Sequence, residues 1–477
     1  MEILFVSSEV APYSHRGPAA DVVAALPKAL RGLDHKVTVV SPLYDSIDPA
    51  RHSLARRLSK IEVQLGDRKL SCELYDGRTA GGVDLLFIRH EEVFRGVEHL
   101  CPSGDADEEA ALRAGLFTRA AVEVARTRDP AVGAIHAHDW IGALFALHAR
   151  TSGELGETPI VLSIHDPSDH GVFDRMVAPA LGLEEGLADS IAKDGEIRLL
   201  PAGFDRVDRV ATSSTTWARE LCTPEAGYGL HEALSGLGDQ LVGIENGVDA
   251  SLWNPTTDPK LPSRYDPMDL SGKARCKADV QRQLGLPVRH DVPVLGMLAT
   301  DGEISGFDLF AKAAPRVLRN DCQIIAVYSG DAEAPLRGVL EELSERWPDR
   351  MQVRDDDGDL PSLVLGASDL LLVPSRREPT GFAHLWAHRY GVLPIAHRIG
   401  SLADAVVDCD AKLETGSGFL FDAATAEDLL AAIRRGMSAF HEREAFEALR
   451  GRVMRVDHSW DRSARLFERL YRGGPSL

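Results

Sequence analysis

The sequence lacks the features that define several large classes of protein. No apolar run approaches the roughly 18 residues of a membrane-spanning helix, and no basic leader precedes the first apolar run, Ile3–Val6. Six cysteines are scattered over 477 residues without a Cys-x-x-Cys pair, which argues against a disulfide framework and favours a reducing compartment. Basic residues are in deficit, because 53 Lys and Arg stand against 73 Asp and Glu, and the net charge of -20 repels nucleic acid and anionic lipid. We therefore expect a cytoplasmic protein with neither a nucleic-acid nor a membrane partner.

Several catalytic and metal-binding motifs are also missing. The sequence contains no Walker P-loop and no G-x-S-x-G elbow, which weakens the kinase, NTPase and α/β-hydrolase hypotheses. The acidic run Asp355–Asp359 resembles the start of a calcium loop, but Leu360 and Gly366 occupy the positions that require glycine and glutamate. We expect a turn there.

What the sequence does contain is an alternation of short β-branched runs with helix-period segments, which is typical of parallel βαβ units. The expected strands of the first half are 3–7, 36–41, 85–89, 134–137, 160–164, 209–212 and 240–244. Those of the second half are 292–298, 324–328, 351–354, 370–373, 393–396 and 418–421. The expected helices are 19–33, 107–127, 140–151, 307–318, 425–436 and 459–472.

The two series predict two domains. Between residues 246 and 262 the pattern breaks into Asn, Pro, Thr and Asp, which suit a hinge. The predicted fold class is α/β, with two doubly wound domains at 1–250 and 251–455. The last segment, 456–477, is expected to be a helix that packs back at the domain junction.

Ligands of open α/β sheets bind beyond the carboxyl ends of the strands, so the loops there are the candidate sites. Residues 14–18 precede a helix, where free N–H groups favour an anion, but taken alone this is weak evidence and a plain surface loop is the preferred explanation. His136 and His138 share one face of a strand; a polar rim is preferred over a metal site, since no further ligands lie nearby. Asp139 either caps the next helix or binds a substrate hydroxyl. His165, at another strand end, is a further rim candidate.

The loop after the strand 370–373 carries an unusual charge. Between Ser375 and Arg398 four arginines and three histidines face one carboxylate, Glu378, in a strongly acidic protein. This local inversion suits an anionic ligand such as a nucleotide diphosphate, while a solvated basic face is the alternative.

Motifs along nearly the whole chain resemble those of bacterial glycogen synthases and plant starch synthases, which are retaining glucosyltransferases of the two-domain GT-B type (glycosyltransferase family 5). The matching segments are Ile3–Pro12, Ala20–Leu30, His136–Trp140, Ile164–His165, Thr223–Leu230, Asn246–Asp249, Trp253–Pro255, Pro374–Gly381, Arg389–Gly391 and Leu402–Asp404. So many matches in order make a chance resemblance very unlikely.

The resemblance implies transfer of glucose from ADP-glucose to the non-reducing end of an α-1,4-glucan, in a cleft between the domains, without metal or cofactor. It implies catalytic roles for His165, Asn246 and Glu378, and sugar-hydroxyl contacts for Asp21 and Asp139. The nucleotide-sugar contacts that it implies are His15, Gly17, Arg376, Arg377, Thr380, Gly381, Thr300 and Ser305.

Some of these positions depart from the family pattern. The family's Lys-x-Gly-Gly is here His15, Gly17 and Pro18, so a fixed cation becomes a titratable one and proline removes an N–H. The family's arginine and lysine that clamp the diphosphate are Thr300 and Ser305. If each lost donor costs roughly 3 kcal/mol, two could lower the rate by about four orders of magnitude.

The departures leave two hypotheses open. The first is an active glucan synthase in which Arg16, Arg377 or His15 replaces the lost cations, or which uses a different nucleotide sugar as donor. The second is a non-catalytic relative that binds glucan or a synthase partner. Other GT-B chemistry, such as sucrose-type or trehalose-type transfer, is a weaker alternative.

Overall fold

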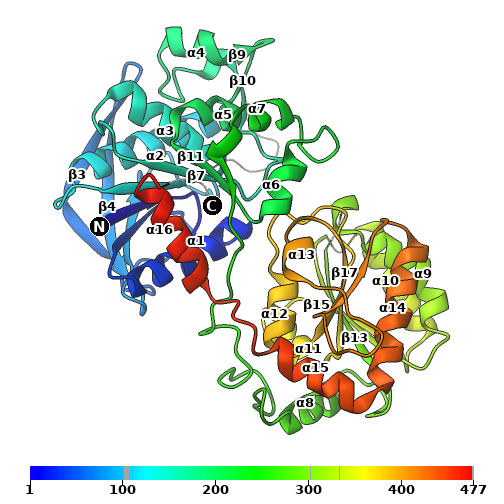
Figure 1. The fold of residues 1–477 in the computed structure, drawn as a ribbon. Helices are drawn as coiled ribbons and strands as arrows, with labels where there is room; N and C mark the ends of the chain where they lie inside the picture. Colours follow the sequence, from blue (N-terminus) through cyan, green and yellow to red (C-terminus); the bar gives the residue numbers. More distant parts are fainter. Residues whose placement is uncertain (101–106, 301, 332, 475–477) are drawn as a thin grey trace. The chain divides into compact units, whose positions relative to one another are not determined.

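The computed structural model describes residues 1–100, 107–300, 302–331 and 333–474, so Cys101 and Asp301 lie outside the described residues. The chain forms two compact units. Unit 1 consists of Met1–Asn246 and Trp460–Leu477, and unit 2 of Gly247–Ser459 (Figure 1). The two doubly wound α/β units predicted from the sequence are confirmed, and each is described by itself.

Unit 1 is built on a nine-stranded sheet in the order β12-β11-β7-β6-β1-β2-β5-β4-β3. Its seven parallel strands are β1 (Glu2–Val6), β2 (Lys36–Pro42), β5 (Asp84–Arg89), β6 (Ala134–His138), β7 (Ile160–Ser163), β11 (Arg209–Thr212) and β12 (Leu241–Gly243). Residues of β1, β6 and β7 are all buried, because helices cover both faces of a parallel sheet.

The sequence analysis missed an antiparallel hairpin at one edge of this sheet. It consists of β3 (Ala55–Leu65) and β4 (Arg68–Arg78), with Leu65 paired to Arg68 across the two-residue turn Gly66-Asp67. β4 pairs antiparallel with β5 and so extends the sheet. A small sheet of β8 (Val172–Asp174), β10 (Glu196–Arg198) and β9 (Ala192–Lys193) was also not predicted.

The helices of unit 1 bury one apolar face each. α1 (Pro18–Gly32) starts at a proline and buries Val22, Val23, Leu26 and Leu30. α16 (Trp460–Tyr471) lies beside α1 although 427 residues separate their nearest ends in the chain (Figure 1). The remaining helices are α2 (Glu108–Arg126), α3 (Asp139–Ser152), α4 (Glu185–Ile191), α5 (Leu199–Ala202), α6 (Thr215–Leu221) and α7 (His231–Gly236).

Unit 2 is a six-stranded parallel sheet in the order β15-β14-β13-β16-β17-β18. The strands are β13 (Val294–Thr300), β14 (Gln323–Ser329), β15 (Met351–Asp355), β16 (Leu370–Val373), β17 (Leu393–His397) and β18 (Phe419–Phe421). The helices are α8 (Ser271–Gln283), α9 (Phe307–Val317), α10 (Pro335–Arg346), α11 (Leu360–Ala367), α12 (Ala383–Arg389), α13 (Gly400–Ala405), α14 (Ala426–His441) and α15 (Arg443–Val453). Within the described part of the chain, every helix is too short or too polar to span a bilayer.

The strand order places the candidate loops. In unit 2 the order reverses between β13 and β16, and in unit 1 the parallel order reverses between β1 and β6. A doubly wound sheet opens a crevice at such a switch point, at the carboxyl ends of the two strands. The loops that follow these four strands contain most of the residues singled out by sequence.

Candidate active site

In unit 1 the loop after β1 is folded around a buried carboxylate. Glu9, 5% exposed, accepts the backbone N–H of Arg16 at 2.7 Å and that of Gly17 at 3.2 Å. From sequence alone the loop is either a plain surface loop or a site that offers free N–H groups to an anion. In this structure they are occupied by Glu9, because a buried carboxylate needs donors of its own.

His15 and Asp21, from this loop and from α1, form a partly exposed pair. His15 Nε2 lies 3.0 Å from Asp21 Oδ2. The hydrogen bond to Asp21 is the main cause that raises the pKa of His15, with burial acting against it. His15 therefore gains positive charge more readily than a free histidine, and the charge lies next to a carboxylate.

The strand ends β6 and β7 bring three histidines together. His136 and His138 stack with ring centroids 4.4 Å apart, which confirms that they share one face of the strand. His138 Nδ1 lies 2.9 Å from His165 Nε2, and His136 bonds to Ser163 and to Tyr471 of α16. Burial lowers the pKa of His165 to about 4, so its ring is neutral at neutral pH. Among the described residues no group of three or more His, Cys, Asp or Glu is arranged to hold a metal ion.

Asp139 organises the loop that carries His165. It begins α3 with a positive φ of 52°, and its Oδ1 accepts the backbone N–H groups of His165 at 2.7 Å and Asp166 at 3.2 Å. Burial of the carboxyl outweighs these two donors and raises the pKa of Asp139 to about 8, although part of the residue's surface is exposed. The side chain holds the backbone of a neighbouring loop, a third role beside the two considered from sequence. Asn246 is half-buried and is the last residue of unit 1 before the chain enters unit 2 at Gly247.

In unit 2 the loop after β16 is closed by Glu378. Its carboxylate accepts the Ser375 hydroxyl at 2.9 Å, the Thr380 hydroxyl at 3.2 Å and the Gly381 N–H at 2.9 Å. Gly381 has a φ of 69°, and a Cβ there would lie 2.2 Å from the Ser401 hydroxyl, so only glycine fits. Glu378 thus shapes the loop that is implied to contact the donor sugar.

The charge surplus inferred for residues 375–398 is largely neutralised in the folded chain. Arg376 forms a two-point ion pair with Asp308, and Arg398 pairs with Asp422 at 2.7 Å. All three histidines of the segment are buried: His384, His388 and His397. Burial lowers the pKa of His384 and His388, so both are neutral at pH 7. The number of cations in the sequence segment was therefore wrong as a measure of the charge available to a ligand. Arg377 is half-buried and directly precedes Glu378 in the chain.

The clamp positions themselves carry no cation. Thr300 is exposed at the end of β13, and Ser305 donates its hydroxyl to the Gly302 carbonyl at 2.7 Å. Gly306 separates this turn from α9, with φ of 72° and a hypothetical Cβ 1.9 Å from the Pro374 carbonyl. The loops after β13 and β16 are thus in direct contact, as a switch-point crevice requires.

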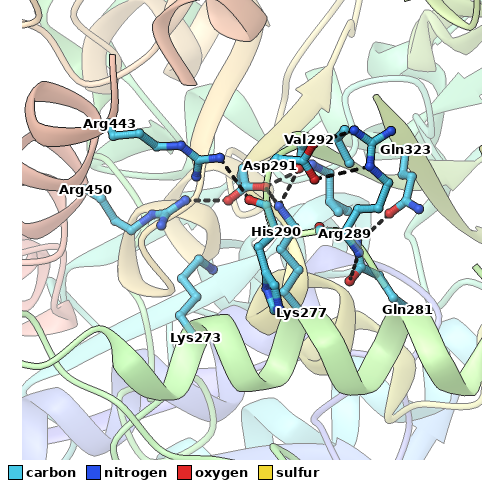
Figure 2. Close-up of polar contacts among 12 residues, drawn as sticks. Lys273, Lys277, Gln281, Arg289, His290, Asp291, Val292, Gln323, Arg443 and Arg450 are labelled. Carbon is cyan, nitrogen blue, oxygen red and sulfur yellow. Dashed lines mark hydrogen bonds and ion pairs between the residues drawn. The ribbon is translucent and has the colours of Figure 1, made fainter. Parts of the chain in front are cut away.

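Unit 2 also contains a basic cavity near the amino ends of β13 and β16, at the end of these strands opposite to the switch-point loops, which the sequence analysis did not identify. Figure 2 shows Lys273 and Lys277 on α8, with Arg443 and Arg450 reaching in from α15. These four residues line a cavity of about 330 Å³. The Lys273 ammonium donates to three backbone carbonyls, and Asp369 pairs with both Lys277 and Arg450 at 2.7 Å. The donors of these three buried cations are bonded within the chain, so the cluster joins α8, α15 and the sheet.

The fold and the switch-point loops define a GT-B glycosyltransferase. The family model "Starch synthase catalytic domain" matches residues 2–236, and "Glycosyl transferases group 1" matches residues 289–438. A glycogen synthase of Anaeromyxobacter sp. (strain Fw109-5) is 38% identical over 481 residues, covering 99% of both chains. One of Geotalea uraniireducens is 32% identical over 479 residues, covering 99% of this chain and 98% of the relative.

A solved structure agrees with these relatives. The catalytic domain of starch synthase IV from Arabidopsis thaliana, bound to ADP and acarbose, superposes with a TM-score of 0.89 at 27% identity and covers 99% of this chain and 98% of that one. Sucrose-phosphate synthase from Thermosynechococcus elongatus, with a TM-score of 0.62 at 17% identity and coverage of 99% and 98%, shares the fold. The chain belongs to the glycogen synthase and starch synthase family and is a glucosyltransferase of that type. None of these comparisons supports the non-catalytic alternative.

Proposed function

We propose that the chain transfers glucose from ADP-glucose to the non-reducing end of an α-1,4-glucan, with retention of the anomeric configuration. The observation that carries this proposal is the full-length similarity to glycogen synthases. His165, Asn246 and Glu378, which the motif resemblance implies to be catalytic, are all present in the sequence and support it. The ADP and acarbose bound by the starch synthase IV relative support a nucleotide sugar and a glucan as the two substrates.

The chemistry requires two kinds of stabilisation. Departure of a nucleotide diphosphate places negative charge on its oxygens, and a carboxylate must orient the donor sugar while positive character develops at its reacting carbon. In the proposal Glu378 supplies the carboxylate, and the backbone at Thr380 and Gly381 contacts the glucose. His165 hydrogen-bonds the sugar near the reacting carbon. The donor and acceptor meet between the two units, which remains a prediction.

Stabilisation of the diphosphate requires cations or N–H donors beside its oxygens. Thr300 and Ser305 carry no charge, and Arg376 is bound to Asp308. The proposal therefore assigns the diphosphate to Arg16 and Arg377 together with His15, whose pKa is raised by its hydrogen bond to Asp21. No metal takes part in the proposed reaction. We also infer a cytoplasmic location. It is supported by the lack of a disulfide among the described cysteines, which are Cys72, Cys222, Cys276, Cys322 and Cys409.

A transfer assay tests the proposal. Purified protein is incubated with glycogen and either ADP-glucose or UDP-glucose, and release of the nucleotide diphosphate is followed together with incorporation of labelled glucose. The proposal expects release and incorporation with ADP-glucose that a Glu378→Gln variant lacks. Glucan binding without release from either donor would favour the non-catalytic alternative, and release from UDP-glucose alone would change the donor.

A further inference from the structure

The imidazole of His165 is hydrogen-bonded to a second imidazole that has no other polar partner. His138 Nδ1 lies 2.9 Å from His165 Nε2, and the rings stack at a centroid distance of 5.2 Å and an angle of 16°. His138 is 2% exposed, and its Nε2 is buried without a hydrogen-bond partner among the described residues. The only ring nitrogen of His138 that bonds is therefore the one facing His165.

The position of the protons follows from counting donors. Burial lowers the pKa of both histidines, so each neutral ring carries one proton. If His165 Nε2 donated, the proton of His138 would lie on its buried Nε2, and an N–H without an acceptor costs about 1 to 3 kcal/mol. If His138 Nδ1 donates, its Nε2 is an unprotonated nitrogen, which is the less costly group to bury. The second arrangement places the proton of His165 on Nδ1.

The surroundings hold both rings in this relation. His138 packs between His165 and His136, and His136 is itself fixed by hydrogen bonds to Ser163 and Tyr471. Asp139 fixes the backbone of His165. His165 Nδ1 has no bond within the described residues and, unlike His138 Nε2, it is not sealed from solvent. The proton of His165 is therefore assigned to Nδ1, the ring nitrogen that faces away from His138.

We propose that His138 is a positioning residue: it donates its Nδ1–H to His165 Nε2 and so fixes the tautomer in which His165 presents Nδ1–H as a donor to a sugar oxygen. The sugar-binding half of this inference rests on the proposed function. The tautomer half does not, because it concerns the protein without substrate. A histidine locked in this way gives a hydrogen bond of one direction only, which favours an oxygen that accepts over a hydroxyl that must donate.

The tautomer is measured directly by nitrogen NMR of protein labelled with 15N-histidine, at pH 7 and without substrate. A His165→Gln variant identifies the His165 signals by their loss. The wild type is expected to show a protonated Nδ1 and an unprotonated Nε2 on His165. A protonated Nε2 would overturn the proposal, whatever the activity of the protein.

Two variants test whether His138 is the cause. His138→Phe keeps a flat ring in the stack but removes the donor, and we expect His165 to shift toward the Nε2–H tautomer. His138→Asn places an amide N–H close to the position of Nδ1 and should retain the Nδ1–H tautomer. As a control, His148→Phe removes another buried histidine of unit 1, bonded to Thr118 and Leu181, and should leave the His165 signals unchanged. An unchanged tautomer in a folded His138→Phe variant would contradict the inference.

Kinetics add the link to the reaction. We expect His138→Phe to lower kcat by roughly tenfold or more, which corresponds to about 1.4 kcal/mol, with a smaller loss in His138→Asn and none in His148→Phe. If the wild type transfers no glucose, the proposed function fails while the NMR result still decides the tautomer. If the wild type is active and the tautomer shifts without change in kcat, the positioning role is refuted.

Discussion

Arg376 and Asp308 form an ion pair between the loop after β16 and the first turn of α9, at the switch point of unit 2. Arg376 Nη1 lies 2.5 Å from Asp308 Oδ1, and Nη2 lies 2.9 Å from Oδ2. The Arg376 hydrogen bonds are the main cause that lowers the pKa of Asp308 to about 2. The Arg376 guanidinium also donates to the Glu303 carbonyl at 2.6 Å, and its backbone N–H donates to the Ile304 carbonyl at 2.7 Å. Arg376 therefore stabilises the structure of these segments, and Asp308 neutralises its charge in the protein without ligand.

Restoring the missing cations should strengthen diphosphate binding. In the variant Thr300→Arg with Ser305→Lys, each charge-assisted hydrogen bond to a phosphate oxygen should add about 1.5 to 3 kcal/mol of affinity for ADP. Titration calorimetry with ADP measures the change, and Thr300→Gln with Ser305→Gln is the uncharged control. Tight ADP binding by the wild type would show that other cations already hold the diphosphate.

Removing the Glu378 carboxylate should abolish transfer while the fold survives. Glu378→Gln keeps an oxygen that can accept from Gly381 but loses the charge, whereas Glu378→Ala loses both. If the charge is what matters, both variants should lose at least about a hundredfold in kcat with little change in Tm. Rates of diphosphate release and thermal melting curves measure the two effects. Full activity in Glu378→Gln would leave the carboxylate only a structural role.

The Asp369 network should be a large contributor to the stability of unit 2. Asp369 is 3% exposed, and its carboxylate compensates the buried cations Lys277 and Arg450. Asp369→Ala leaves Lys277 without a counter-charge and Arg450 with only the partly exposed Glu447, and it should cost about 3 to 5 kcal/mol. The exposed Asp291, which pairs with Arg289 in the same region, is the matched control, and Asp291→Ala should cost less than about 1 kcal/mol (Figure 2). Urea unfolding of the two variants gives both values, and equal costs would disprove the assignment.

Buried histidines should make the protein lose stability in mild acid. Burial lowers the pKa of His148 from 6.5 to about 3, so the unfolded chain binds a proton before the folded chain does as the pH falls. The stability that His148 contributes is complete above pH 6.5 and is lost progressively as the pH falls toward 3, on the order of 5 kcal/mol in total. The variant His148→Gln should have a flatter stability profile between pH 6.5 and 4, measured by urea unfolding at each pH. An unchanged slope would show that His148 is protonated in the folded state.

The parallel core was predictable because each of its strands is a short apolar run between turn residues. The β3–β4 hairpin was missed because β3 is mostly exposed and rich in charge, with Arg56, Arg57, Lys60 and Glu62 in sequence. Its stability comes from pairing with a neighbour in the sheet, which no local apolar pattern records. The turn Gly66-Asp67 was the one signal that could have revealed it.

The candidate site was predictable as positions but not as charges. The motifs predicted that Glu378 and His165 follow the carboxyl ends of strands, and in the structure they follow β16 and β7. The partners of Arg376 and Arg398, however, are Asp308 and Asp422, which are 68 and 24 residues away in the chain. Likewise, counting the N–H donors of the first loop does not show that the Glu9 carboxylate already accepts those of Arg16 and Gly17. Electrostatics at a site depends on such distant pairings, and a sequence segment read by itself overstates its charge.

The route of the chain gives unit 1 an unusual order of assembly. Its sheet is complete by β12, but the helix whose Tyr471 bonds to His136 follows only after all of unit 2. During synthesis the face of unit 1 that α16 covers therefore stays exposed until more than 200 residues of unit 2 have been translated. The two units cannot be separated by a single cut in the gene without removing a part of the first. A chain that ended before Trp460 would lack α16, and His136, which packs against His138, would lose its hydrogen bond to the Tyr471 hydroxyl.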